Sequence, residues 1–320
     1  MSSLLQAPIS KSFKGRDFLL LLDYSSEEFK HLIDVAVELK AMQKKGEPHP
    51  YLQGKTLAMI FQKSSTRTRV SFEVAMYQLG GYPLFLSSND LQMGRGETIA
   101  DTARTLSRYV DGIMIRTYAQ SDVEELAEYA DIPVINGLTD LVHPTQVVAD
   151  LQTVLEHKGK LAGLKMAFLG DGNNVAHSLM AGCAKVGMHI TLANPAGYRP
   201  MPEMVEKAME VAKTTGSIIE ITEDPIAAVK GADVIYTDVW ASMGQEKEQA
   251  ERAKTMAPYQ VNAELMSYAK PDYIFLHCLP AKREQEVTSE ILDGPHSVAF
   301  DEAENRLHAH KAILALLMQK

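Results

Sequence analysis

The sequence is poor in cysteine, has no long apolar run and carries no excess of positive charge. Its two cysteines, Cys183 and Cys278, are too few for a disulfide framework or a cysteine-rich metal site. No stretch approaches the roughly 18 uninterrupted apolar residues that a membrane helix needs. The formal net charge of −9 argues against a basic stripe that would bind nucleic acid. We therefore expect no membrane or nucleic-acid partner, and a bound anion would need a local cluster of positive side chains.

The N-terminal residues lack the apolar core and the small-residue cleavage site of a secretory signal, so we expect a cytoplasmic protein. A length of 320 residues suits two domains of roughly 150 residues each. The composition, 46% hydrophobic and 23% charged, is that of a folded globular protein.

Apolar runs alternate with helical patterns along most of the chain, which indicates an α/β protein. A capping box at Ser25 and Glu28 begins the first helix, and Pro144 lies in the first turn of a helix that reaches about His157. We expect two domains, each a parallel β-sheet flanked by helices: residues 1–150 with a closing helix at about 302–320, and residues 151–301. The predicted strands are 56–61, 83–86, 112–115, 133–135, 165–169, 190–193, 218–221, 234–237 and 273–276.

Polar segments follow predicted strands in both halves of the chain. In open parallel sheets, ligands bind beyond the carboxyl ends of the strands, so these segments predict an active site in the cleft between the two domains. They are Ser64 to Arg69, Arg116, Asn136 to Gln146, Gly170 to Asn174, Asp238 to Gly244 and His277 to Pro280.

Residues 65–69, Ser-Thr-Arg-Thr-Arg, combine hydroxyls and two guanidinium groups with the free N–H groups of a predicted helix start. Helix N-termini attract phosphate through these N–H groups and the helix dipole, so the segment predicts an anion site. A plain helix cap is the alternative, and the doubled arginine after a strand favours the anion site. The segment lacks the Gly-x-x-x-x-Gly-Lys frame of a Walker loop.

Four segments in this order resemble motifs of the aspartate and ornithine carbamoyltransferases. Residues 61–69 (FQKSSTRTR) resemble the carbamoyl-phosphate motif, and residues 143–146 (HPTQ) resemble the second motif of the family. Residues 238–244 (DVWASMG) and 277–280 (HCLP) resemble the ornithine branch in particular. The resemblance extends from about residue 15 to the C-terminal helix. One departure is Gln62, where many relatives carry Glu.

The resemblance implies a set of residues for each substrate and for catalysis. Arg116, His143, Cys278 and Asp238 would be catalytic, with Arg116 and His143 donating to the carbamoyl oxygen as negative charge builds there. Asn174, Asp238, Ser242 and Met243 would bind ornithine. Carbamoyl phosphate would be bound by Ser65, Thr66, Arg67, Thr68, Gln92, Arg116, His143, Gln146, Cys278, Leu279 and Arg306.

Three of these segments have other interpretations. Residues 170–174 could form a dinucleotide loop, but the fingerprint would need glycine at Val175 and an acidic residue after the next strand. A Cys-His nucleophile at His277 and Cys278 is possible, although adjacent residues on an extended segment project to opposite sides. Cys183 lies in an apolar helical run and is expected in the core.

The activity that the resemblance implies is transfer of the carbamoyl group of carbamoyl phosphate to the side-chain amine of ornithine, giving citrulline in arginine metabolism. An amine such as putrescine or N-acylornithine is the alternative acceptor, although Ser242-Met243-Gly244 matches the form that grips a free α-amino acid. A nucleotide-linked dehydrogenase or a non-catalytic binding module is the alternative from another class. We expect no metal and no cofactor. The family also implies a homotrimer, in which residues 87–96 reach into the neighbouring subunit and present Gln92 to carbamoyl phosphate.

Overall fold

The computed structural model describes residues 3–88, 90–93, 96–241, 244 and 246–319. The chain forms two compact units, and the last helix contributes to the first of them. One unit contains Met1–Gln152 and Asn305–Lys320, and the other contains Thr153–Glu304. The division falls between Gln152 and Thr153, inside the helix that begins at Pro144, whereas the sequence placed it at residue 150.

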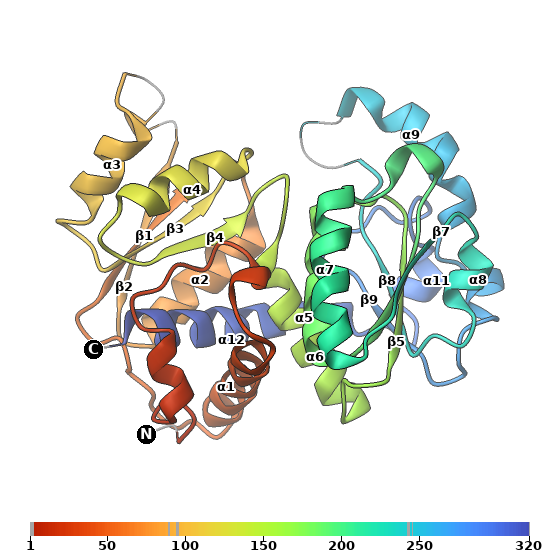
Figure 1. The fold of residues 1–320 in the computed structure, drawn as a ribbon, viewed down its shortest axis with the longest axis horizontal. Helices are drawn as coiled ribbons and strands as arrows, with labels where there is room; N and C mark the ends of the chain where they lie inside the picture. The colour runs from red at the N-terminus through yellow and green to blue at the C-terminus, as the bar shows by residue number, and fades with distance from the viewer. Residues whose placement is uncertain (1–2, 89, 94–95, 242–243, 245, 320) are drawn as a thin grey trace. The chain divides into compact units, whose positions relative to one another are not determined.

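The first unit is built on a parallel sheet with the order β2-β1-β3-β4 (Figure 1). Alternate strand residues such as Ala58, Ile60 and Ile113 pack with α3 and α4, and α1, α2 and α12 lie on the other side of the sheet. The elements are α1 (Ser26–Lys44), β1 (Thr56–Phe61), α2 (Thr66–Gln78), β2 (Tyr82–Ser87), α3 (Ile99–Leu106), β3 (Gly112–Arg116), α4 (Gln120–Tyr129), β4 (Val134–Leu138), α5 (Pro144–Lys158) and α12 (Ala299–Met318).

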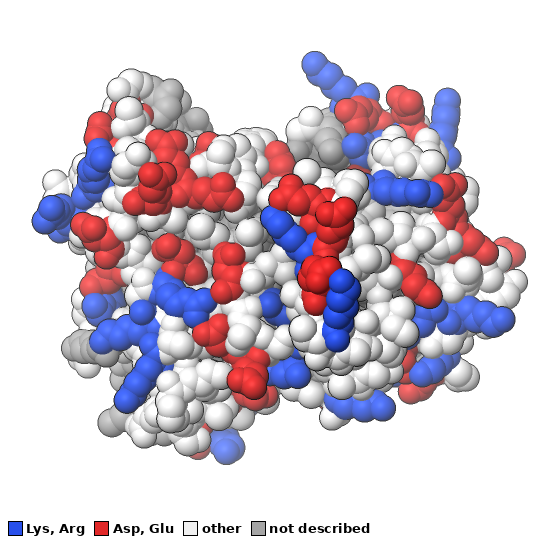
Figure 2. All heavy atoms as spheres, viewed as in Figure 1, with Lys and Arg blue, Asp and Glu red and all other residues white. Residues whose placement is uncertain are grey.

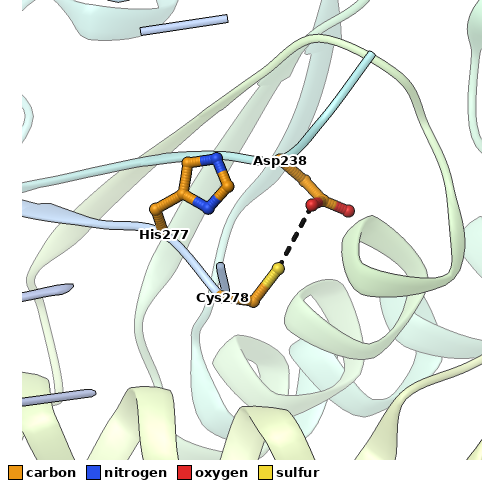
Figure 3. Close-up of side chains that lie close together, drawn as sticks. All are labelled: Asp238, His277 and Cys278. Carbon is orange, nitrogen blue, oxygen red and sulfur yellow. Dashed lines mark hydrogen bonds between the residues drawn. The ribbon is translucent and has the colours of Figure 1, made fainter. Parts of the chain in front are cut away.

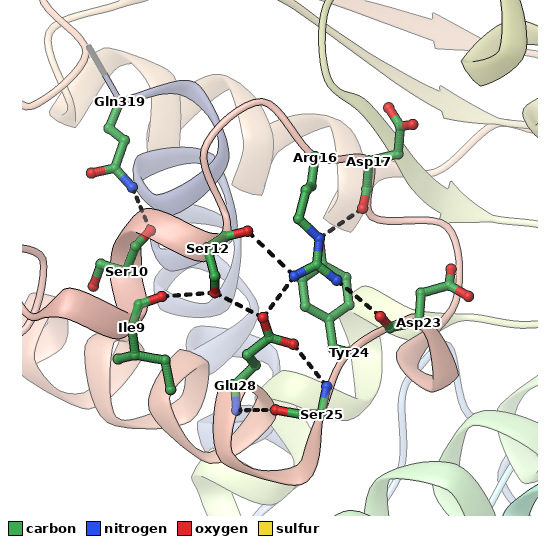
Figure 4. A network of polar contacts seen from close by, with 10 residues as sticks. All are labelled: Ile9, Ser10, Ser12, Arg16, Asp17, Asp23, Tyr24, Ser25, Glu28 and Gln319. Carbon is green, nitrogen blue, oxygen red and sulfur yellow. Dashed lines mark hydrogen bonds and ion pairs between the residues drawn. The ribbon is translucent and has the colours of Figure 1, made fainter.

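The segment before α1 covers the β4 edge of this sheet and is held by a polar network (Figure 4). Phe18 forms a parallel bridge with Ile135, which pairs backbone groups that would otherwise be exposed at the edge. Glu28 accepts hydrogen bonds from Ser25 N (2.8 Å) and Arg16 Nη1 (2.6 Å), so the predicted capping box is confirmed and tied to the segment before it.

The second unit contains a parallel sheet with the order β7-β6-β5-β8-β9. One face of this sheet packs against α8, α10 and α11, and α6 and α7 lie together on the other face (Figure 1). The elements are β5 (Lys165–Leu169), α6 (Asn174–Val186), β6 (His189–Ala193), α7 (Pro202–Thr215), β7 (Ile219–Thr222), α8 (Pro225–Val229), β8 (Val234–Thr237), α9 (Gln249–Met256), α10 (Ala263–Met266), β9 (Ile274–Leu276) and α11 (Ser289–Leu292).

The predicted α/β class with two parallel sheets is confirmed, and every predicted strand corresponds to an observed one. Buried parallel strands are apolar on both faces, so they stand out in the sequence as short continuous runs. The closing helix begins at Ala299, three residues before the predicted start, and Cys183 is fully buried as expected. Among the described residues, no helix combines the length and the apolar character that a membrane crossing requires.

Candidate active site

The residues predicted to bind an anion lie at the point of the first sheet where the strand order reverses. β1 has β2 on one side and β3 on the other, so the segments after β1 and β3 diverge from adjacent strand ends. Ligands bind at such switch points in parallel sheets. Ser65 caps α2 here: its Oγ accepts from Thr68 N (3.2 Å), and Thr66 is the first residue of the helix.

Arg306 connects the last helix to this turn. Its Nη2 donates to the hydroxyl of Thr68 at 2.8 Å, and both side chains are buried. This contact places a buried guanidinium group beside the capped N-terminus of α2, and both features favour an anion.

His143 stands among the positive charges of the first unit. Burial lowers the pKa of its imidazole well below the usual range, and the charges of Arg306, Arg116 and Arg67 lower it further. The side chains of this cluster come from α2, the end of β3, the residue before α5 and α12. A neutral imidazole beside guanidinium groups can donate a hydrogen bond to an oxygen on which negative charge develops.

The two arginines of the 65–69 segment have different surroundings. Arg67 interacts with the His143 cluster, whereas Arg69 pairs with Glu73 (2.9 Å) and lies 3.6 Å over the ring of Phe85. Of these two guanidinium groups, that of Arg67 belongs to the cluster around His143, and that of Arg69 is engaged by Glu73 and Phe85. On the face shown in Figure 2, acidic side chains gather over α4, so the anion is favoured by the buried cluster and not by this surface.

Two other residues predicted to bind carbamoyl phosphate, Gln146 and Gln92, lie on different segments of the first unit. Gln146 lies in the first turn of α5, where its N–H contacts His143 O (3.2 Å) and its Nε2 donates to Asp150 Oδ1 (2.8 Å). Gln92 lies between β2 and α3, and its carbonyl accepts from Glu97 N (3.4 Å).

In the second unit, Asp238 and Cys278 point toward one another (Figure 3). The Cys278 thiol donates to Asp238 Oδ1 at 3.2 Å, and Asn173 Nδ2 donates to Asp238 Oδ2 at 2.8 Å. Asp238 follows β8 and Asn173 follows β5, and these adjacent strands form the switch point of the second sheet. A nearly buried carboxylate at this place suits a cationic or amine ligand.

His277 does not pair with Cys278 as a catalytic base. Its Nδ1 accepts from Leu279 N (2.9 Å), so its Nε2 carries the proton and faces Glu286 Oε1 at 3.3 Å. The ligand atoms of Asp238, His277 and Cys278 lie within 4.8 Å of one another, a spacing that suits a metal ion. A metal would have to displace one of the two contacts of the His277 ring, so the geometry favours hydrogen bonding.

Leu279, predicted to bind carbamoyl phosphate, and Asn174, predicted to bind ornithine, each follow a strand of the second sheet. Leu279 has a left-handed backbone with φ 57°, an uncommon conformation for a branched side chain, held by the Leu279 N–H bond to His277. Asn174 begins α6, and its Oδ1 accepts from Val175 N (3.0 Å). Ser242 and Met243, like Gly94 and Arg95 in the predicted intersubunit loop, lie outside the described residues.

Several supporting residues were missed by the sequence interpretation. Glu302 Oε2 accepts from His277 N (2.8 Å), and Arg252 donates to Asp171 (2.7 Å) and to Trp240 O (3.2 Å). Burial raises the pKa of Asp171, and the Arg252 charge opposes that rise. These contacts join segments far apart in the chain, so no local sequence pattern could predict them.

The loop at residues 170–174, which follows β5, requires a glycine at position 172. A Cβ there would lie 2.3 Å from Pro200 N, closer than any side chain tolerates. Close packing against Pro200 therefore accounts for Gly172, and no bound dinucleotide is needed to explain it. This agrees with the incomplete dinucleotide fingerprint of the segment.

Residues 16–156 match the family model described as "Aspartate/ornithine carbamoyltransferase, carbamoyl-P binding domain". Residues 162–317 match the one described as "Aspartate/ornithine carbamoyltransferase, Asp/Orn binding domain". The chain belongs to the aspartate/ornithine carbamoyltransferase family.

Individual members of the aspartate/ornithine carbamoyltransferase family are similar over nearly the whole chain. An ornithine carbamoyltransferase of Carboxydothermus hydrogenoformans is 64% identical over 307 residues, which cover 96% of this chain and 99% of the relative. A Pyrococcus furiosus protein named "Ornithine carbamoyltransferase, anabolic" is 58% identical, covering 96% and 98%. The solved ornithine carbamoyltransferase of Pyrococcus furiosus superposes with a TM-score of 0.94 at 57% identity, covering 96% of this chain and 98% of that one. The predicted family membership is confirmed.

Proposed function

We propose that this chain is an ornithine carbamoyltransferase, which forms citrulline and phosphate from carbamoyl phosphate and ornithine. The observation that carries the proposal is the buried cluster of arginines around a neutral His143, next to the capped N-terminus of α2. Such a cluster suits a phosphorylated substrate that also presents a polarisable carbonyl oxygen. The names of the similar proteins support the same activity.

The first unit would bind carbamoyl phosphate. Ser65, Thr66, Arg67 and Thr68 would hold the phosphate, with Arg306 oriented by Thr68. Arg116 and His143 would donate to the carbamoyl oxygen, and Gln146 would bind the carbamoyl amide. Preorganised donors of this kind are each worth roughly 10²–10³ in rate, because negative charge on that oxygen grows toward the transition state.

The second unit would bind ornithine. Asp238 would attract the ammonium group, with Asn173 and the Cys278 thiol orienting its two carboxylate oxygens. Asn174, Ser242 and Met243 would hold the α-amino acid end, and Cys278 and Leu279 would contact the reacting group.

In the reaction, the neutral δ-nitrogen attacks the carbamoyl carbon and the bond from this carbon to the phosphate oxygen breaks. The proton that the nitrogen loses passes to an acceptor, Asp238 or the departing phosphate. This chemistry requires neither a covalent enzyme intermediate nor a metal.

We also propose a cytoplasmic homotrimer that works in arginine metabolism. The sequence similarity to proteins named ornithine carbamoyltransferase, one of them anabolic, supports the metabolic setting. Free Cys183 and Cys278 suit a reducing compartment.

The test is a product assay on the full chain with carbamoyl phosphate and one of three acceptors: ornithine, putrescine or N-acetylornithine. We expect citrulline, identified by mass spectrometry, and at least roughly a hundredfold lower kcat/KM for the other two amines. Faster reaction with putrescine or N-acetylornithine would instead support the alternative acceptor. Thermal stabilisation by nicotinamide nucleotides but not by carbamoyl phosphate would indicate the dehydrogenase class.

A further inference from the structure

Helix α12 holds the start of α2 at two places. Arg306 Nη2 donates to Thr68 Oγ1 at 2.8 Å, and four residues later His310 Nδ1 lies 2.9 Å from Ser71 Oγ. Residues four apart lie on the same face of a helix, so both contacts come from one side of α12. His310 is fully buried, and its ring stacks on Phe72 with centroids 3.8 Å apart and planes 16° apart.

The hydroxyl of Ser71 connects His310 to the backbone of the predicted phosphate-binding turn. Ser71 Oγ lies 2.5 Å from Arg67 O and 3.2 Å from Thr68 O. A hydroxyl has one proton, and donating it to Arg67 O leaves Ser71 Oγ to accept from His310 Nδ1–H. The result is a chain of hydrogen bonds from His310 through Ser71 to the carbonyl group of Arg67.

The surroundings of His310 select the same tautomer. Nε2 is buried and has no hydrogen-bond partner among the described residues. A proton on Nε2 would therefore bury an unpaired donor, which costs more than burying an unpaired lone pair. Burial and the charge of Arg306 lower the pKa of His310 well below the usual range, so the ring stays neutral.

We propose that His310 is a positioning residue for carbamoyl phosphate: through Ser71 it fixes the backbone that carries Arg67 and Thr68. The inference rests on the proposed function and adds to it a residue that does not touch the substrate. A serine that bonds to the carbonyl four residues earlier tends to bend a helix, and the His310 bond sets where this hydroxyl points. Small displacements of a group that holds a reactant reduce binding and rate disproportionately.

The test compares two substitutions of His310 that differ in one hydrogen bond. His310→Phe retains an aromatic ring beside Phe72 but cannot donate, whereas the amide nitrogen of His310→Asn can take the place of Nδ1–H. We expect His310→Phe to raise the Kd for carbamoyl phosphate, measured by calorimetry, and the KM for it about three- to tenfold, as when one buried hydrogen bond is lost. The KM for ornithine should stay unchanged, and His310→Asn should recover most of the affinity.

Ser71→Ala tests the same chain from its other end and decides the matter if His310→Phe fails to fold. It should raise the same Kd, and the double variant should be no worse than the poorer single one, because both break one chain. Wild-type affinity in Ser71→Ala and in folded His310→Phe would overturn the inference, as would equal effects on both substrates or equal losses in His310→Phe and His310→Asn. Failure of the wild-type chain to bind carbamoyl phosphate would instead refute the proposed function.

Discussion

At the scale of single residues, the first unit combines strong positive charge with histidines that stay neutral. His143 and His310 are both fully buried near Arg306, and that charge makes a further positive charge unfavourable. The cluster thus attracts an anion through its guanidinium groups and keeps imidazole N–H groups as neutral donors.

Arg67→Ala should remove most affinity for carbamoyl phosphate and leave the fold intact, because Arg67 is only partly buried and belongs to the charge cluster. The expected loss is about 2–5 kcal/mol of binding free energy, as when one partner of a desolvated charge pair is removed. Calorimetric titration with carbamoyl phosphate measures it. The matched control is Arg69→Ala, since Arg69 is already engaged by Glu73 and Phe85, and it should bind as the wild type does. Wild-type affinity in Arg67→Ala would refute the phosphate assignment.

The two substrates should respond differently to pH. The attacking amine must be neutral and its ordinary pKa is near 10.4, so kcat/KM for ornithine should rise steadily between about pH 6.5 and 8.5. The lowered pKa of His143 means that it gains a proton only at a pH well below 6.5, so it adds no limb to this window. The value of kcat/KM for carbamoyl phosphate should therefore stay nearly flat. Initial-rate profiles with each substrate varied in turn check both statements, and a flat ornithine profile would contradict an amine nucleophile.

At the scale of secondary-structure elements, α12 is unusual because its buried face carries polar side chains. Arg306 and His310 contact α2, and on the same helix Lys311 donates to Gln43 Oε1 (2.6 Å) and lies 3.2 Å from His49 Nε2. The helix therefore holds α1 and α2 together through hydrogen bonds as well as apolar packing.

Lys311 should make the stability of the chain depend on pH in the alkaline range. Burial lowers the pKa of its ammonium group from 10.5 to about 8, so between these values the unfolded chain keeps a proton that the folded chain has lost. The free energy of unfolding contributed by this group therefore rises with pH through that window. Relative to Lys311→Met, the wild type should gain about 1–3 kcal/mol from pH 8 to 10.5, measured by denaturant unfolding. Exposed Lys14→Met is the control, and a difference from Lys311→Met that does not change with pH would contradict the prediction.

The elements were predictable from the sequence because their signals are local. Strand β1 is a continuous apolar run, and α1 begins at a capping box, so each was placed to within a residue or two. The anion site at Ser65 to Thr68 was predicted in the same way, from a helix start after a strand. The contact of His310 with Ser71 could not be found in this way, because 239 positions separate the two residues and neither belongs to a recognisable pattern.

At the scale of the whole molecule, the two units share one construction and differ in charge. Each is a parallel sheet in which some predicted ligand residues, such as Arg67 after β1 and Asp238 after β8, follow a strand at the switch point. The first unit has Arg67 and Arg116 after these strands, and the second has Asp238, which accepts from the Cys278 thiol. In the proposed function the first unit would bind the anionic substrate and the second would bind the amine, the same assignment of halves that the family resemblance implied.

The proposed trimer should share its active sites between subunits, with Gln92 of one chain serving the cluster of its neighbour. Gln92 lies on the polar segment between β2 and α3. If Gln92→Ala and Arg116→Ala each nearly abolish activity, the two variants can be dissociated, mixed equally and reassembled. A site on a Gln92→Ala chain served by an Arg116→Ala neighbour contains neither substitution. In a cyclic trimer about a quarter of all sites are of this kind, because each of two independent choices has even odds. Citrulline formation near that fraction of the wild-type rate would support sharing, and no recovery after subunit exchange verified by mass spectrometry would show that Gln92 acts within its own chain or in no site.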